Sequence, residues 1–284
     1  MSPPNDNFII YKEDEIYRLI ISLIVLFLNL AEVYFIIYKW TAKKKRKTIY
    51  ETYLLSLSFA DVTFSLANMV FATMILANSG NLIIATIGYV LSLYLSVSHI
   101  SAITVDRLIA IIFPLTHKLK VRVTHARKVI LTLWVVCVAI GVVLYFAYRY
   151  NTFEKYTQIS IRFIKFIIYV SDIIFIVAYI ILCYILLRQE NKLPASTRGT
   201  NTEKNILILC LLTSLVFVCC TLPVAIHFSL HFDWPAKLTY LLVANSGLNS
   251  LLYFFHGRFV HNYRKRLKTQ RLQKTASASS SSTQ

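Results

Sequence analysis

Seven runs of predominantly apolar residues recur along the chain, and each is close to or above the length that crosses a bilayer. The runs span residues 16–38, 52–76, 82–113, 129–148, 159–187, 205–232 and 238–255. A helix needs about 20 apolar residues to cross the hydrocarbon core of a membrane. Backbone polar groups must be satisfied internally there, so such runs are expected to be helical. We therefore predict an all-α membrane protein with a seven-helix transmembrane bundle over residues 16–255.

The composition excludes several other classes of protein. Of the 284 residues, 57% are apolar and only 15% are charged, which is too few for the surface of a soluble protein of this size. The net charge of +17 does not indicate nucleic-acid binding, because Lys and Arg occupy the gaps between apolar runs. No phosphate-binding loop, zinc-protease motif or paired Cys-x-x-Cys occurs. We expect neither an enzyme nor a resident cofactor, and, with all five cysteines inside apolar runs, no structural disulfide.

The distribution of Lys and Arg predicts the orientation in the membrane. Basic clusters follow the first, third and seventh runs, and a weaker one follows the fifth. Loops rich in Lys and Arg remain in the cytosol. Segment 1–15 is then an extracellular N-terminus without a signal peptide, and the C-terminus is cytoplasmic. We expect a multi-pass protein of the plasma membrane.

The segment after the last run divides into two parts. Phe255, Phe259, Tyr263 and Leu267 recur every four residues with basic residues between them. This pattern predicts an amphipathic helix over 256–268 that lies on the lipids of the inner leaflet. Residues 269–284 are rich in serine and have no apolar periodicity, so we predict a disordered cytoplasmic tail. Its hydroxyls are candidate kinase targets, or the tail is simply solvated.

Four acidic residues fall inside or at the end of an apolar run: Glu32, Asp61, Asp106 and Asp172. A charge at the centre of a bilayer costs roughly 2.5–3.5 kcal/mol on insertion scales, so each acid needs a partner or a function. Glu32 is either protonated or bonded near Asn29, and the sequence does not decide between these alternatives.

Asp61 has several candidate partners at a similar depth. Ser96 lies deep in the third run, and Asn245 and Asn249 lie in the seventh, beside Ser246. Their oxygens suit a sodium ion or a proton, because hard cations prefer oxygen ligands. We predict an ion pocket at Asp61, Ser96, Asn245 and Asn249; the alternative is a structural polar cluster that ties helices together.

The ordered set of polar and aromatic residues resembles that of the rhodopsin-like (class A) G-protein-coupled receptors. The resemblance covers residues 29–259, with one element in each run and the elements in the family's order. No single element is specific, whereas the ordered set is. The elements are Asn29, Leu57…Ala60-Asp61, Asp106-Arg107-Leu108…Pro114, Trp134, Tyr184, Phe217…Cys220-Thr221-Leu222-Pro223 and Asn249-Ser250…Tyr253.

Three departures from the family's pattern concern its outer half and its last run. The cysteine pair that usually joins the third run to the second outer loop is missing. Thr221 stands at the position of the tryptophan credited with sensing the ligand. Ser250 replaces the proline of the seventh run, and its hydroxyl is expected to bend the helix by bonding a carbonyl one turn back.

The resemblance implies a switch at the cytoplasmic end of the third run. Arg107 would be held by the adjacent Asp106 and by Glu203 at the start of the sixth run. The alternative is that Glu203 is an exposed charge favoured by the helix dipole. The switch set is Asp106, Arg107, Tyr184, Glu203, Pro223, Asn249 and Tyr253. On this resemblance an extracellular ligand moves the sixth run outward and a heterotrimeric G protein binds, with a receptor kinase and arrestin as candidate partners of the tail.

Asp172 is the main candidate for a ligand contact. It is an anchor for a cationic ligand group, or it pairs with a neighbouring side chain such as His99 or Asn68. The other candidate pocket residues are Tyr89, Leu93, His227, Phe228 and Thr239. The family's amine-binding aspartate corresponds to Tyr89 here and its retinal-binding lysine to Val243, which excludes a biogenic amine and retinal and favours a peptide or another small molecule.

Two other functions fit the acidic residues in the apolar runs. One is a small proton- or ion-coupled transporter, although the seven unequal runs show no matching halves. The other is a receptor-like protein that has lost ligand sensing, which would agree with Thr221 and the missing cysteines.

Overall fold

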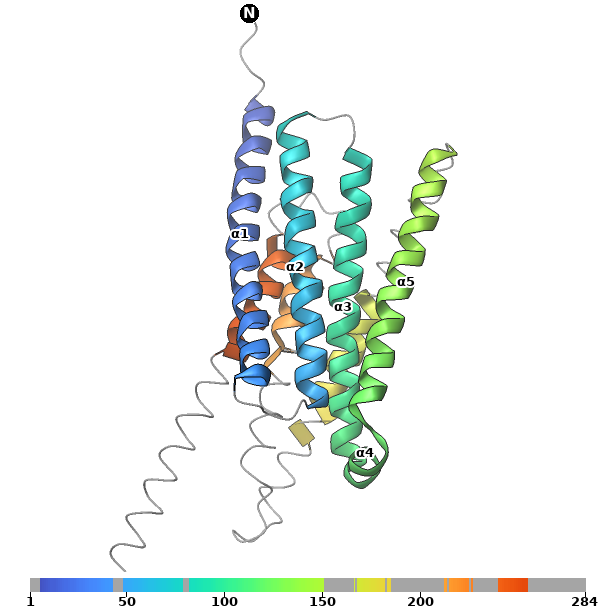
Figure 1. Ribbon diagram of the computed structural model, residues 1–284. Coiled ribbons are helices and arrows are strands. Elements are labelled where there is room, and N and C mark those ends of the chain that lie inside the picture. Colours follow the sequence, from blue (N-terminus) through green and yellow to red (C-terminus); the bar gives the residue numbers. More distant parts are fainter. Residues whose placement is uncertain are drawn as a thin grey trace, which may run out of the picture.

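The elements in the described part of the chain are all helices, joined by short turns (Figure 1). A computed structural model of the protein describes residues 6–42, 48–78, 82–150, 166, 168–181, 183–184, 212–213, 215–224, 226 and 240–254. Its helices are α1 (Asp6–Thr41), α2 (Ile49–Leu76), α3 (Leu82–Ile112), α4 (Pro114–Lys120) and α5 (Val123–Arg149). Three shorter helical stretches follow, at Ile168–Ile181, Leu215–Val224 and 240–254. The predicted all-α class is thus confirmed for these residues, while the amphipathic helix 256–268 and the tail 269–284 lie outside them.

Among the described residues, four helices have the length and composition of membrane spans. The spans are Glu13–Thr41, Ile49–Leu76, Ile84–Ala110 and Val123–Arg149, and they coincide with the first four apolar runs. The helices α1 and α5 begin ten and six residues before the corresponding runs at 16 and 129. Polar residues do not end a helix, so the apolar pattern marks the part in hydrocarbon rather than the helix ends.

A short helix, α4, follows α3 and was not predicted. The third run was expected to extend to Phe113, but α3 ends at Ile112 and α4 begins with Pro114. Proline is favoured at the first position of a helix, because it has no N–H to leave unsatisfied and its φ angle is already helical. The sequence signal for this helix was therefore Pro114 itself.

The helices α1, α2, α3 and α5 lie side by side, with the C-terminal stretches behind them (Figure 1). Contacts join α1 to α2, α2 to α3, and α5 to both α2 and α3. Behind them, Ser101 of α3 donates to Ser171 over 3.1 Å. The Phe175 and Phe217 rings lie 4.5 Å apart and join the segments Ile168–Ile181 and Leu215–Val224. The core thus lies between the four long helices and the later stretches.

Large apolar side chains cover the outside of the helices as well as the core. Phe64, Phe175 and Phe217 are fully buried, whereas Phe27 is 64% and Tyr34 is 71% exposed on α1. Such exposure would promote aggregation in water. In a bilayer it places apolar side chains against lipid, in agreement with the predicted membrane protein.

The connection between α1 and α2 is fixed by polar contacts of Glu51. Thr48 caps the N-terminus of α2 by accepting from the Glu51 N–H over 3.1 Å. The Glu51 carboxylate binds the Lys39 ammonium and accepts a hydrogen bond from the Trp40 indole over 3.2 Å. At the other end of α2, Asn78 has a φ of 49°, a left-handed conformation that asparagine tolerates.

Two glycines provide a test of the packing between α1 and the 240–254 helix. A Cβ atom on Gly247 would lie 2.9 Å from Cγ2 of the buried Val25, whereas a Cβ on Gly88 would meet no atom within 4 Å. Valine has little rotamer freedom in a helix and cannot move away easily. We expect Gly247→Ala to lower the melting temperature of the purified protein and Gly88→Ala to leave it unchanged or raise it. Equal shifts for both variants would contradict this packing.

Candidate functional site

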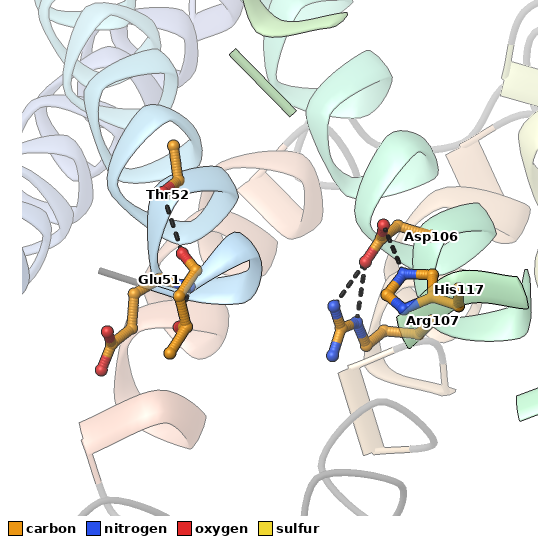
Figure 2. A network of polar contacts seen from close by, with 6 residues as sticks. Glu51, Thr52, Asp106, Arg107 and His117 are labelled. Atoms are coloured by element: carbon orange, nitrogen blue, oxygen red, sulfur yellow. Dashed lines mark hydrogen bonds and ion pairs between the residues drawn. The ribbon is translucent and has the colours of Figure 1, made fainter. Parts of the chain in front are cut away.

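Arg107 lies near the end of α3 and is held by its neighbour in sequence. Its Nη2 and Nε atoms donate to Oδ2 of Asp106 over 2.5 and 3.0 Å (Figure 2). The other oxygen of Asp106 lies 3.2 Å from Nε2 of His117 on α4. Asp106 is only 9% exposed. The predicted Asp106–Arg107 pair is therefore present, and α4 adds a second partner for the carboxylate.

Aromatic rings connect Arg107 to the 240–254 helix. The guanidinium carbon lies 5.3 Å from the centre of the Tyr50 ring of α2. Tyr50 packs edge-on against Tyr253, with 5.9 Å between ring centres. Arginine over an aromatic face is stabilised by the ring's quadrupole. The sequence prediction named Arg107 and Tyr253 but missed Tyr50, which has no motif, and His117, whose signal was the helix start at Pro114.

The other predicted switch residues are placed only in part. Tyr184 is 61% exposed at the end of its helical stretch, and Pro223 lies half-buried in Leu215–Val224. Glu203 lies outside the described residues, so its contact with Arg107 stays a prediction.

Asp61 is buried in α2 and bonded to α3. Ser96 donates to Oδ1 of Asp61 over 2.5 Å, as the ion-pocket prediction required. Ser246 of the 240–254 helix lies close to the Asp61 carboxylate. The predicted ligand set omitted Ser246, although it lies beside Asn245 in sequence and three residues before Asn249, on the same side of the helix.

The amide groups of the predicted ion pocket suit a hard cation. Oδ1 of Asn245 and both amide atoms of Asn249 are buried and have no hydrogen-bond partner among the described residues. Buried polar atoms are normally satisfied, so atoms of this kind call for an explanation such as a bound ion or water. Carboxylate, hydroxyl and amide oxygens are the ligands that sodium prefers, and Asp61, Ser96, Asn245 and Asn249 supply them.

Ser250 bonds across to α1 and not to its own helix. Its hydroxyl lies 2.6 Å from Oδ1 of Asn29 and 2.7 Å from Oε2 of Glu32. The prediction that it bends the helix by bonding a carbonyl one turn back is therefore wrong. Asn29 and Glu32 lie one turn apart on α1 and together offer better-placed polar partners. The expectation that Glu32 is bonded near Asn29 fits this arrangement.

His99 joins α3 to α2 and α5. Its Nδ1 lies 2.8 Å from the Leu95 carbonyl, and its Nε2 lies 2.8 Å from the Ser56 hydroxyl. Ser56 also accepts from the Trp134 indole of α5 over 3.2 Å. Both ring nitrogens are therefore engaged by the protein. The histidine connects three helices and is not available to Asp172.

Asp172 is buried and bonded to a residue that the sequence did not suggest. Its Oδ1 lies 2.7 Å from the Thr221 hydroxyl, which also lies 2.8 Å from the Phe217 carbonyl oxygen one turn back. The alternative that Asp172 pairs with a neighbouring side chain is confirmed, but the partner is Thr221. His99 is engaged elsewhere, and Asn68 donates to the Phe64 carbonyl of its own helix. Oδ2 of Asp172 has no hydrogen-bond partner among the described residues. The predicted inward orientation of Asp172 is correct.

The remaining candidate ligand contacts either pack against other side chains of the bundle or lie outside the described residues. Tyr89 sits between the rings of Phe64 and Phe71, at 5.7 and 5.5 Å, and Leu93 is part of the buried core. The last three candidates, His227, Phe228 and Thr239, lie outside the described residues. Among the described residues, no three His, Cys, Asp or Glu side chains come together as a metal site.

The comparison with protein families identifies the class of protein. The family model of the 7 transmembrane receptors (rhodopsin family) matches residues 32–254. The chain therefore belongs to this family of G-protein-coupled receptors, whose members are membrane proteins and in general not enzymes. In general they respond to extracellular ligands and signal through G proteins. The comparison with curated proteins finds no match to the sequence.

The Asp172–Thr221 bond generates a prediction about stability. Replacing Thr221 by Val keeps the shape but leaves a buried carboxylate oxygen without its donor, which costs about 1–3 kcal/mol. We expect Thr221→Val to lower the melting temperature and Thr221→Ser, which keeps the hydroxyl, to lower it less. Thermal unfolding of the purified variants measures this. Melting of both variants at the wild-type temperature would contradict the bond.

Proposed function

We propose that the protein is a plasma-membrane receptor with an extracellular N-terminus, and that it converts ligand binding into G-protein activation by outward movement of its sixth transmembrane helix. The observation that carries this proposal is the arrangement around Arg107. The guanidinium is held on its own helix by Asp106 and rests on Tyr50, which packs against Tyr253. It thus contacts α3 and α2 directly and is linked to the 240–254 helix through Tyr50.

The contacts of Arg107 suit a switch because one partner can be exchanged while Asp106 stays bound. The Asp106–Arg107 pair is largely buried, with side chains 9% and 14% exposed, whereas a solvent-exposed pair with Glu203 would contribute only about 0–1 kcal/mol. A ligand shifts the equilibrium between the resting and active states only by the difference in its affinity for them. A small free-energy difference between the two states is therefore easily reversed. In the resting state Glu203 also binds Arg107, and in the active state Tyr184 and Tyr253 occupy the space it leaves.

Movement of the sixth helix is proposed to occur about Pro223. Proline removes one backbone hydrogen bond and bends a helix, so the part before it can swing without breaking further bonds. Tyr184 is largely exposed, which leaves its side chain free to turn toward the opened face. The G protein then binds that face. The kinase and arrestin contacts of the tail and the lipid contacts of 256–268 stay proposals of the same kind.

The proposed latch predicts an effect of Glu203→Gln. Loss of the charge should raise ligand-independent signalling by up to about fivefold, because the pair contributes at most about 1 kcal/mol. Second-messenger output at equal surface expression measures this. Glu190→Gln, which removes another acid between the fifth and sixth apolar runs, serves as the matched control and should have no effect. The latch is wrong if both variants signal at the wild-type level.

The ligand is proposed to contact Asp172, whose second oxygen is buried and lacks a hydrogen-bond partner among the described residues. A cationic group of a peptide or small molecule would satisfy that oxygen. Asp172 is bonded to Thr221 of the sixth helix, so a ligand that competes for the carboxylate acts directly on the helix proposed to move. Tyr89, Leu93, His227, Phe228 and Thr239 are the other proposed pocket residues.

Sodium is proposed as an allosteric ligand of Asp61. Binding to the folded state alone raises stability by mass action, by about 2.7 kcal/mol at one hundred times the dissociation constant. We expect sodium chloride to raise the melting temperature of the purified receptor relative to choline chloride at equal ionic strength. Asp61→Asn should abolish the difference, whereas Asp172→Asn should keep it. An equal response of the wild type to both salts would exclude the ion site.

A further inference from the structure

Glu32, Asn29 and Ser250 form a buried group of oxygens between α1 and the 240–254 helix. The Ser250 hydroxyl lies between two acceptors, 2.6 Å from Oδ1 of Asn29 and 2.7 Å from Oε2 of Glu32. Asn29 is 0% and Ser250 is 3% exposed. The other hydrogen-bond partners of these side chains show how many protons the two contacts of the Ser250 oxygen need.

The orientation of the Asn29 amide is fixed by the backbone. Its Nδ2 atom lies 3.0 Å from the Val25 carbonyl oxygen and 3.3 Å from the Ser246 hydroxyl. A carbonyl oxygen only accepts, so the atom facing it must be the donating nitrogen. The atom facing Ser250 is therefore the amide oxygen, which also only accepts. Ser250 consequently donates its proton to Asn29.

The contact between Ser250 and Glu32 then needs a second proton. A hydroxyl has one proton, so full hydrogen bonds from the Ser250 oxygen to both Asn29 and Glu32, at 2.6 and 2.7 Å, need a second proton. Two oxygens without a proton between them repel each other at this distance. The Ser250 hydroxyl has used its proton on Asn29, so the second proton comes from the Glu32 carboxyl.

The surroundings of Glu32 agree with a neutral acid. None of the ion pairs in the described part of the chain includes it, and the one cation on its own helix near that end, Lys39, is bound to Glu51 of α2. On α2 the facing groups are Asp61, which is itself acidic, and Ser58, whose proton goes to the Leu54 carbonyl. Oε1 of Glu32 is buried without a partner among the described residues, which costs far less for a neutral carbonyl oxygen than for a charged one.

We propose that Glu32 is a proton-binding site, with the bound proton lying between its Oε2 atom and the Ser250 hydroxyl. The proton completes a chain of hydrogen bonds from Glu32 through Ser250 and Asn29 to Ser246. The chain ties α1 to the 240–254 helix beside the proposed ion pocket. Ser250 stands where the family's pattern has proline, which has no hydroxyl. The hydrogen bond between Glu32 and Ser250 is therefore particular to this sequence. The proposal of a proton site does not depend on the proposed ligand or G protein.

Infrared spectroscopy tests the proposal directly. A protonated carboxyl gives a carbonyl stretching band that a carboxylate lacks and that shifts in heavy water. In the purified full-length protein, Glu32→Gln should remove one such band, Asp61→Asn should leave that band in place, and Ser250→Ala should shift it. An unchanged acid-band region in Glu32→Gln would show that Glu32 is ionised and would overturn the proposal.

Thermal unfolding provides a second, independent readout. Glutamine has a donor at the same place as the protonated acid, so Glu32→Gln should melt at the wild-type temperature. Glu32→Ala should melt lower, and the further loss caused by Ser250→Ala should be smaller in that background than in the wild type, because the bond between Ser250 and Glu32 is already gone while the bond to Asn29 is still lost. Equal losses for Glu32→Gln and Glu32→Ala would indicate a charge-dependent contact and overturn the proposal. If Glu32→Ala does not fold, the infrared bands of Glu32→Gln still show whether Glu32 carries a proton.

Discussion

The cost of placing polar groups in hydrocarbon determines how these helices fit together. A polar side chain that faces lipid has no water to bind, so each buried polar group must find a partner on another helix or in its own backbone. The side chains of Asp61, Asn29, His99 and Asp172 do so and thereby join neighbouring helices. Interhelical bonds of this kind contribute only about 0.6–2 kcal/mol each. These hydrogen bonds determine which faces of neighbouring helices meet, whereas apolar side chains form most of the contact between the helices.

The two ends of the bundle differ in how closely they follow the family's pattern. Around Arg107, the family's neighbouring acid, Asp106, and the tyrosine of the last helix, Tyr253, are both present. Tyr50 packs between Arg107 and Tyr253. In the half that holds Thr221, a threonine bonded to Asp172 replaces the tryptophan, and the family's cysteine pair is missing. The end around Arg107 thus follows the family's pattern, whereas the end around Asp172 is particular to this chain.

Much of the fold followed from the sequence, because apolar length alone defines a membrane span. The first four spans were predicted, while the helix ends and α4 were not, since helices continue beyond the hydrocarbon and α4 is polar. The Asp61–Ser96 and Asp106–Arg107 pairs were predicted because they occupy positions of the family's pattern. The partners of Asp172 and Ser250 were not, because both bonds involve a residue that departs from that pattern, so only the arrangement of the helices reveals them.

We propose that G-protein activation by this receptor depends on Arg107. Nucleotide exchange by purified heterotrimeric G proteins, with the protein in lipid discs, measures it most directly. We predict that the wild type accelerates exchange on at least one G-protein class over empty discs, and that Arg107→Ala removes the acceleration without changing the melting temperature by more than a few degrees. Equal exchange rates for the wild type, Arg107→Ala and empty discs across all classes would contradict the account.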